Sequence, residues 1–187
     1  MDDTFARGPL LLLAGRANRP LAAEIGQILK ENPESATIRN FADQEIFVRI
    51  DHNARGRDVF IIQPTVAPAD TIMELLLLID AATRASAARV TAVVPYFGYG
   101  RQDRKDQPRV AIGAKLVANL MVAAGADRMI GMDFHQHQIH AAVQQTFHLF
   151  LIGASEFVER DIAKAGVIHV RRHGGGAVGW TDATGDK

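Results

Sequence analysis

The sequence predicts an α/β protein with a mainly parallel β-sheet and helices on both of its faces. Apolar runs of strand length alternate along the chain with longer stretches that have helical periodicity. The runs are almost continuously apolar, which is typical of strands that are covered on both sides. Strands that are separated by helices are joined by crossover connections, and these connections produce parallel pairing.

The first expected elements are a strand, a helix and a pair of strands. Residues 9–14 form the first apolar run, and Asn18 is a suitable N-cap for a helix that extends to about residue 30. Two strand-like segments, residues 35–41 and 45–50, then flank a short turn. Segments this close together in sequence are expected to form a small hairpin.

The alternation continues as far as residue 133. The expected elements are a strand at 58–63, a helix at 70–84, a strand at 89–95, a helix at 112–124 and a strand at 127–132. After about residue 166 the pattern weakens. Residues 171–187 have no apolar periodicity, so we expect this tail to be poorly packed.

The composition argues against several classes of function. The 187 residues include 21 basic and 21 acidic side chains, whereas nucleic-acid-binding proteins usually have a basic excess. Cysteine is absent, which excludes disulfides, thiol catalysis and cysteine-type zinc sites and favours a cytoplasmic location. The longest apolar stretch, residues 72–82, contains acidic residues and is shorter than the roughly 20 residues of a membrane span. We therefore expect no nucleic-acid partner and no membrane segment.

Two polar loops, residues 96–109 and 133–140, directly follow predicted strands. Ligands of open parallel sheets bind beyond the carboxyl ends of the strands, so both loops lie where chemistry is expected. The first loop carries basic side chains that could neutralise a triphosphate: Arg101, Arg104, Lys105 and Arg109. Its aromatic side chains could stack on a purine: Tyr96, Phe97 and Tyr99. The alternative for this loop is a solvated segment with local ion pairs.

The second loop contains three histidines, His135, His137 and His140. Histidine at a strand end is a common metal ligand, and Asp133 adds an oxygen donor. These histidines could equally lie at the surface or at the start of a helix without any ligand.

A third candidate is the turn of the expected hairpin, which carries Phe41, Asp43 and Glu45. Acidic residues in a turn usually just cap it. Taken alone, the turn is therefore a weak signal of function.

Taken together and in this order, these segments resemble the ribose-phosphate pyrophosphokinases. FADQEIFVRI resembles the nucleotide flag of that family, and PYFGYGRQDRK is the most specific segment of the match. The stretches RGRDVFIIQPT and PRVAIGAKLVANLMVAAGADRMIGMDFHQHQI also follow the family pattern. The resemblance covers about residues 9–166.

The resemblance implies a phosphoribosyltransferase-like, three-layer α/β fold with a mainly parallel sheet and a small flag hairpin. Residues 1–150 would form an N-terminal ATP-binding domain, and residues 151–187 a remnant of the second domain. The activity would convert ATP and ribose 5-phosphate into phosphoribosyl diphosphate and AMP, with Mg²⁺ as the cofactor. The family assembles as homo-oligomers, from dimers into hexameric rings.

The resemblance also implies roles for individual residues. His135 would be the catalytic residue and would lie beside the Mg²⁺. Arg55 matches an arginine of the family's allosteric phosphate site. The ATP-binding residues would be Phe41, Asp43 and Glu45 of a neighbouring subunit's flag, together with Arg101, Gln102 and Asp103.

Some positions depart from the family pattern. Gln44 stands where the family usually has glycine, and Gly113 replaces a commoner residue near a helix start. His173 occupies the place of a metal-binding aspartate, and the family's second domain does not follow it. We therefore expect the chain to be an impaired member of the family that binds ribose 5-phosphate poorly.

Two other functions are compatible with the sequence. One is a non-catalytic regulatory partner that joins the rings of a complete synthetase. The other is a metal-dependent hydrolase built on the D-x-H-x-H pattern, in which His135 and His137 would hold zinc.

Overall fold

The computed structural model describes residues 9–33, 36–105, 107–132 and 148–152. Within these residues the chain forms a five-stranded sheet in the order β1-β4-β5-β6-β7, and every neighbouring pair of strands is parallel. Its strands are β1 (Leu10–Ala14), β4 (Asp58–Ile62), β5 (Arg89–Val94), β6 (Arg128–Met132) and β7 (His148–Ile152). The predicted α/β class with a mainly parallel sheet is confirmed.

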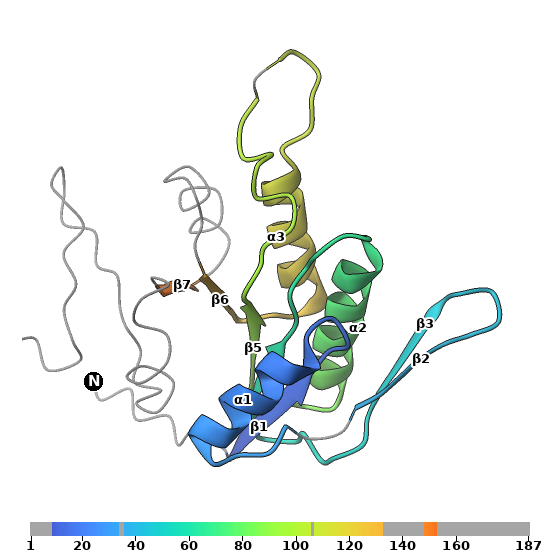
Figure 1. The fold of residues 1–187 in the computed structure, drawn as a ribbon, viewed down its shortest axis with the longest axis vertical. Helices are drawn as coiled ribbons and strands as arrows, with labels where there is room; N and C mark the ends of the chain where they lie inside the picture. The colour runs from blue at the N-terminus through green and yellow to red at the C-terminus, as the bar shows by residue number, and fades with distance from the viewer. Residues whose placement is uncertain (1–8, 34–35, 106, 133–147, 153–187) are drawn as a thin grey trace, which may run out of the picture.

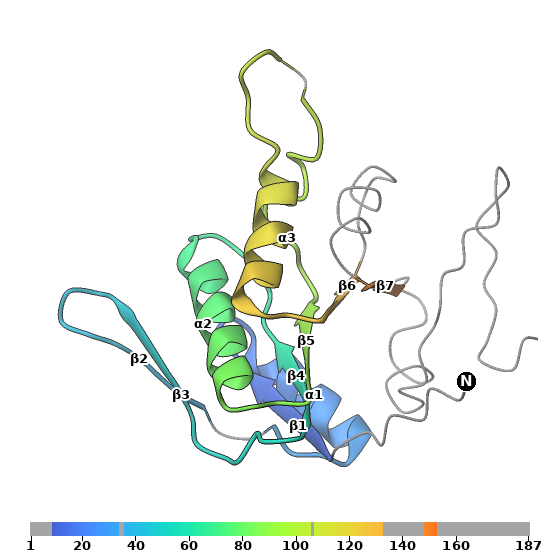
Figure 2. The ribbon, with the colours of Figure 1, turned by 180° about the vertical axis from the view of Figure 1, so that it is seen from behind.

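In the described part of the chain, helices cover both faces of this sheet (Figures 1 and 2). They are α1 (Arg19–Leu29), α2 (Asp70–Arg84) and α3 (Gly113–Ala124). Helix α1 packs on one face, whereas α2 and α3 lie against each other on the opposite face. No helix in the described ranges is long and apolar enough to cross a membrane.

The apolar strands supply side chains to two separate cores. Leu11 and Leu13 of β1 point to the core under α2 and α3, and Leu12 between them points to the core under α1. In β4, Ile61 likewise points to the core under α2 and α3, and Ile62 points to the core under α1. Successive residues of a strand face opposite sides, so a strand buried on both sides has to be apolar throughout. Each fully buried Leu or Ile contributes about 1.5–3 kcal/mol relative to an exposed one.

A two-stranded antiparallel hairpin lies outside the main sheet. It consists of β2 (Ala36–Asn40) and β3 (Ile46–Ile50). Strand β3 contacts α2, and the half-buried Ile38 and Val48 pack against the larger core. The hairpin extends outward beside α2 (Figure 1), and Asn40, next to its turn, stays within hydrogen-bond distance of Arg16 after β1. The predicted small hairpin is confirmed.

Local signals explain how α1 begins and ends. Asn18 caps the helix, because its side chain accepts a hydrogen bond of 3.2 Å from the backbone N–H of Leu21. The helix ends at Leu29, and Lys30 takes a left-handed conformation with φ 56°. Strand β7 was not predicted from the sequence, although its residues HLFLI form a short, mainly apolar run. The domain division near residue 150 stays a prediction.

Candidate functional site

The carboxyl ends of β1, β4 and β5 meet at one edge of the sheet, because these strands are parallel neighbours. Polar loops follow each of these ends, at residues 15–17, 63–69 and 95–112. This is the edge where open parallel sheets bind their ligands.

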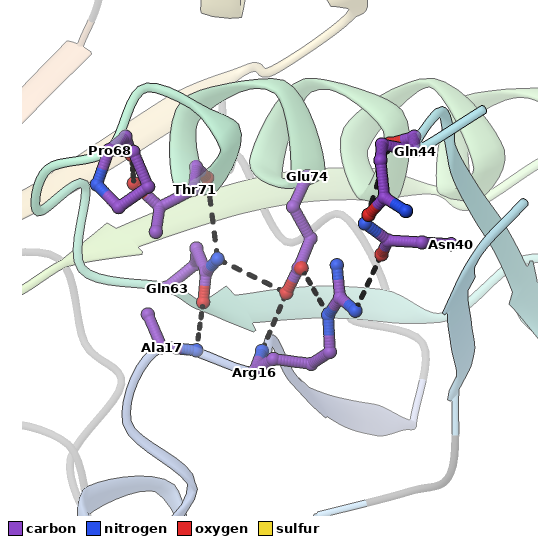
Figure 3. A network of polar contacts seen from close by, with 8 residues as sticks. All are labelled: Arg16, Ala17, Asn40, Gln44, Gln63, Pro68, Thr71 and Glu74. Carbon is purple, nitrogen blue, oxygen red and sulfur yellow. Dashed lines mark hydrogen bonds and ion pairs between the residues drawn. The ribbon is translucent and has the colours of Figure 1, made fainter. Parts of the chain in front are cut away.

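The centre of this edge is a buried carboxylate, Glu74 of α2, which is only 3% exposed. Arg16, just after β1, binds both of its oxygens. The backbone N–H of Arg16 donates to Oε1 at 2.6 Å, and its Nε donates to Oε2 at 2.6 Å (Figure 3). A buried charge is costly unless it is paired and hydrogen-bonded, and Arg16 meets both requirements.

Gln63, at the end of β4, completes this arrangement and is wholly buried. Its Nε2 donates to Glu74 Oε1 at 3.2 Å and to the carbonyl oxygen of Thr71 at 3.3 Å. Its Oε1 accepts from the backbone N–H of Ala17 at 3.2 Å (Figure 3). We call Arg16, Gln63 and Glu74 the Glu74 cluster. It joins the loop after β1 to β4 and α2.

Gly15 allows this close approach. A Cβ atom at this position would collide with the side-chain amide of Gln63. The absence of a side chain therefore lets the loop after β1 lie directly against the Glu74 cluster.

The turn of the hairpin carries Phe41, Asp43 and Glu45. The backbone N–H of Phe41 donates to the carbonyl oxygen of Glu45 at 2.8 Å, and Gln44 N–H donates to the carbonyl oxygen of Phe41 at 3.0 Å. Asp43 Oδ1 accepts from the backbone N–H of Glu45 at 3.2 Å, so this acid does cap the turn. Gln44 has φ 73°, a conformation that favours glycine.

The outward face of the hairpin pairs a cation with two aromatic rings. The guanidinium of Arg39 lies 4.8 Å from the ring centroid of Phe41 and 4.7 Å from that of Phe47. The two rings meet edge to face, with centroids 5.7 Å apart. Phe41 is nevertheless 41% exposed, so part of its ring is free to contact another group.

The loop of residues 96–109, which we call the basic loop, is fixed at its base. The backbone N–H of Gly98 donates to Thr65 Oγ1 at 2.7 Å, and Thr65 N–H donates to the carbonyl oxygen of Tyr96 at 2.8 Å. A Cβ atom at Gly98 would collide with the carbonyl oxygen of Thr65. The loop after β5 is thus tied tightly to the loop after β4.

Further along, the basic loop is attached to the start of α3. The backbone N–H of Gln102 donates to the carbonyl oxygen of Tyr99 at 2.8 Å, and Ala114 N–H donates to the carbonyl oxygen of Gln102 at 3.2 Å. A Cβ atom at Gly113 would lie 2.7 Å from Gln102 Oε1. The unusual glycine at position 113 therefore makes room for the side chain of Gln102.

The charged groups of the basic loop remain available. Four of its basic side chains are exposed and form no ion pair with a described carboxylate: Arg101, Arg104, Lys105 and Arg109. The local ion pairs of the alternative interpretation are therefore not formed among the described residues. Asp103 Oδ2 is buried and has no hydrogen-bond partner there either.

One expectation about this loop is wrong. Phe97 is only 7% exposed and belongs to the larger hydrophobic core, so it is not free to stack on a purine. Tyr96 and Tyr99, at 55% and 46% exposed, remain accessible. The burial of Phe97 instead anchors the loop.

The structure groups the predicted site residues into separate sets. Arg101, Gln102 and Asp103 share the basic loop, but the hairpin turn projects from a different part of the same chain (Figures 1 and 2). Arg55 is exposed in the loop between β3 and β4, where its backbone N–H donates to Asn53 Oδ1 at 3.1 Å. His135 and the rest of the second polar loop lie outside the described residues, so its metal-binding role stays a prediction.

The sequence analysis missed the Glu74 cluster. The available signal was a polar residue inside an otherwise apolar segment, at Gln63 in DVFIIQ and at Glu74 in IMELLLLI. Within the ranges that the structure covers, no group of three or more His, Cys, Asp or Glu side chains could hold a metal ion.

Comparison with known proteins identifies the family. Residues 10–125 match the N-terminal domain of ribose phosphate pyrophosphokinase. The ribose-phosphate pyrophosphokinase of Chlorobaculum tepidum is 54% identical over 143 residues, which are 76% of this chain and 44% of that protein. The Agrobacterium fabrum protein of the same name is 52% identical over 153 residues, or 81% of this chain and 48% of that protein.

A solved structure agrees with these relatives. The phosphoribosylpyrophosphate synthetase of Mycobacterium smegmatis superposes with a TM-score of 0.73 at 42% sequence identity, over 79% of this chain and 49% of that one. The chain spans about half the length of the curated relatives it matches. The family match covers well over half of the 187 residues and includes both the hairpin and the basic loop. The chain belongs to the ribose-phosphate pyrophosphokinase family.

Proposed function

We propose that this chain supplies the ATP-binding part of a ribose-phosphate diphosphokinase, and that the basic loop holds the triphosphate. The observation that carries this proposal is a set of exposed cations that pair with no described carboxylate, on a loop whose base is fixed. Arginine forks suit phosphate oxygens, and a cation without a carboxylate partner loses no ion pair when it binds one. Fixing the base of the loop reduces the entropy lost when the ligand is bound.

The reaction would transfer a diphosphate group from ATP to ribose 5-phosphate. The ribose 1-hydroxyl oxygen attacks the β-phosphorus, the bond from that phosphorus to the α,β-bridging oxygen breaks, and AMP leaves while the hydroxyl loses its proton. Such a transfer depends on alignment and on neutralisation of charge rather than on covalent catalysis. Arg101 and Arg104 would neutralise the phosphates, and Mg²⁺ bound to the same phosphates would add to this effect.

Adenine recognition would combine two of the groups described above. Asp103 Oδ2 has no hydrogen-bond partner among the described residues, and a carboxylate oxygen suits the exocyclic amine of adenine better than a phosphate. Phe41 offers part of an aromatic ring for stacking. Since the hairpin turn and the basic loop project apart in one chain, we propose that the turn of a second copy completes the site.

Calorimetric titration of the 187-residue chain with Mg-ATP tests the nucleotide site. We expect saturable binding of ATP that is weaker for AMP, because AMP lacks the two phosphates that the cations would hold. Absence of ATP binding at protein concentrations that support self-association would overturn the proposal. Light scattering on the same sample reports whether copies associate.

An assay for AMP release from ATP and ribose 5-phosphate tests the reaction. We expect slow turnover by this chain alone, because His173 replaces the metal-binding aspartate of the family pattern. The reaction is disproved for this chain if AMP forms at the same rate without ribose 5-phosphate. Fast, ribose 5-phosphate-dependent turnover would contradict only the expected impairment.

A further inference from the structure

The Glu74 cluster extends through Arg16 to the turn of the hairpin. We propose that Arg16 is a positioning residue that sets the hairpin turn for nucleotide binding, acting through Asn40. The inference rests on the proposed function, because it assigns the turn a role in holding ATP. Its structural part, the control of the turn by Arg16, can be measured without any nucleotide.

Arg16 has polar contacts in two directions. Its Nε donates to the buried Glu74, while its Nη1 donates to Asn40 Oδ1 at 2.8 Å. Asn40 is the last residue of β2, and its Nδ2 donates to the carbonyl oxygen of Gln44 at 3.4 Å (Figure 3). Gln44 lies between Asp43 and Glu45 in the turn. A continuous series of hydrogen bonds therefore joins the sheet edge to the predicted ATP-binding residues.

The two ends of this series differ in rigidity. Gln63 and Glu74 are buried and held by α2 and β4, so they form a fixed anchor. The turn is exposed and contains Gln44 in a conformation that disfavours any residue other than glycine. A strained, exposed turn needs outside support to keep a single conformation, and the bond from Asn40 supplies it.

Arginine is the residue type that this position requires. Its planar guanidinium donates in several fixed directions, so it can bind Glu74 and Asn40 at the same time. Lysine at position 16 would keep the charge beside Glu74, but its point-like ammonium would not hold both partners in this geometry. The proposal therefore predicts that Arg16→Lys preserves the fold while releasing the turn.

Hydrogen exchange on the full chain without nucleotide tests the structural part. In Asn40→Ala and in Arg16→Lys, we expect the turn amides of Phe41 and Gln44 to exchange roughly 3–10-fold faster. Asn40→Ala removes the bonds to Arg16 and to Gln44, and Arg16→Lys removes the bond to Asn40. Exchange in β4 should not change. Asn40→Asp keeps the acceptor for Arg16 but loses the donor to Gln44, so its turn amides should exchange about as fast as those of Asn40→Ala.

Arg19→Ala serves as the matched control, since it removes an exposed arginine that has no partner among the described residues. The proposal is overturned if the turn amides exchange alike in the wild type, Asn40→Ala and Arg16→Lys. It is also overturned if Asn40→Asp exchanges as slowly as the wild type, because the bond from Asn40 to Gln44 would then not hold the turn.

ATP titration of the same variants tests the functional part. We expect Asn40→Ala and Arg16→Lys to weaken ATP binding roughly 3–10-fold, with Arg19→Ala unchanged. Faster exchange of the turn with unchanged ATP affinity would overturn the role in nucleotide binding. If the wild type binds no ATP, the proposed function fails, while the exchange data still decide whether Arg16 controls the turn.

Discussion

Two polar regions occupy the same edge of the sheet, and they use their charges in opposite ways. In the Glu74 cluster, the buried carboxylate and amide bind groups of this chain, and the cluster joins β1, β4 and α2. In the basic loop, the backbone is fixed by Thr65 and by α3, but the cations are exposed and unpaired among the described residues. The first region stabilises the edge, and the second is available to a ligand.

The difference separates structural from binding roles among charged residues. A carboxylate whose partners all come from the same chain contributes to folding, and its removal leaves donors unsatisfied. A cation without a partner contributes little to folding, so its removal should mainly affect what binds there. Removal of the Glu74 carboxylate should therefore mainly change stability, whereas removal of a basic-loop cation should mainly change ligand binding.

The largest effect on stability is expected for Glu74→Ala. This change leaves the backbone N–H and Nε of Arg16 without their acceptors and removes one of the two acceptors of Gln63 Nε2, so the free energy of unfolding should fall by about 2–4 kcal/mol. Urea unfolding followed by circular dichroism measures it. Glu24→Ala on the exposed side of α1 is the control and should stay within about 0.5 kcal/mol of the wild type. Equal stability of the two variants would contradict the structural role of the Glu74 cluster.

Arg101→Ala should weaken ligand binding and leave the stability of the fold nearly unchanged. Loss of a charged hydrogen bond to phosphate should weaken ATP binding about 10–100-fold, while the free energy of unfolding changes by less than about 0.5 kcal/mol. Calorimetric titration and urea unfolding measure the two quantities on the same preparation. If Arg101→Ala destabilises the fold and leaves ATP affinity unchanged, the distinction between the two regions is wrong.

A smaller effect is expected in the hairpin turn. Gln44→Gly replaces a residue at φ 73° with the one residue that has no Cβ penalty there, so the free energy of unfolding should rise by about 1 kcal/mol. Thermal unfolding measures the change. Glu24→Gly in the middle of α1 is a control of opposite sign, because glycine destabilises an exposed helix interior by about 1 kcal/mol. A loss of stability in Gln44→Gly would contradict the described turn.

The smallest effect concerns the base of the hairpin. The Thr37 hydroxyl, which donates to the Asp51 carboxylate, and the neighbouring Arg49 guanidinium lower the pKa of Asp51 below its ordinary value. A lowered carboxyl pKa stabilises the fold above the unfolded-state pKa, and this contribution is lost as the pH falls through the folded-state value. The stability difference between the wild type and Asp51→Asn should therefore shrink on acidification from neutral pH. A difference that grows on acidification would exclude this linkage.

Much of the fold was predictable because strand and helix signals are local. The run DVFIIQ and the cap at Asn18 predicted β4 and the start of α1 to within a residue or two. Strand β7 was missed, since HLFLI gives a short apolar run without the flanking signals that placed the other strands. The burial of Phe97 was missed because a loop sequence does not reveal which of its aromatic side chains turns back into the core.

The candidate site was predictable in part, and for a physical reason. Exposed cations after a strand are visible in the sequence, so the basic loop was found. The Glu74 cluster depends on residues 58 positions apart, Arg16 and Glu74, which only the folded chain brings together. Gln44 gave a partial signal of the turn's geometry. It stands where the family usually has glycine, and a glycine in a turn indicates a position with positive φ.

The most direct test of the account compares ATP with adenosine on the wild type and on Arg101→Ala/Arg104→Ala. If the basic loop holds the triphosphate, the double variant should lose most of its affinity for ATP while its weaker affinity for adenosine stays the same. Raising the salt concentration should weaken ATP binding to the wild type more than to the double variant. An ATP affinity that is identical in the two proteins at every salt concentration would contradict the central claim.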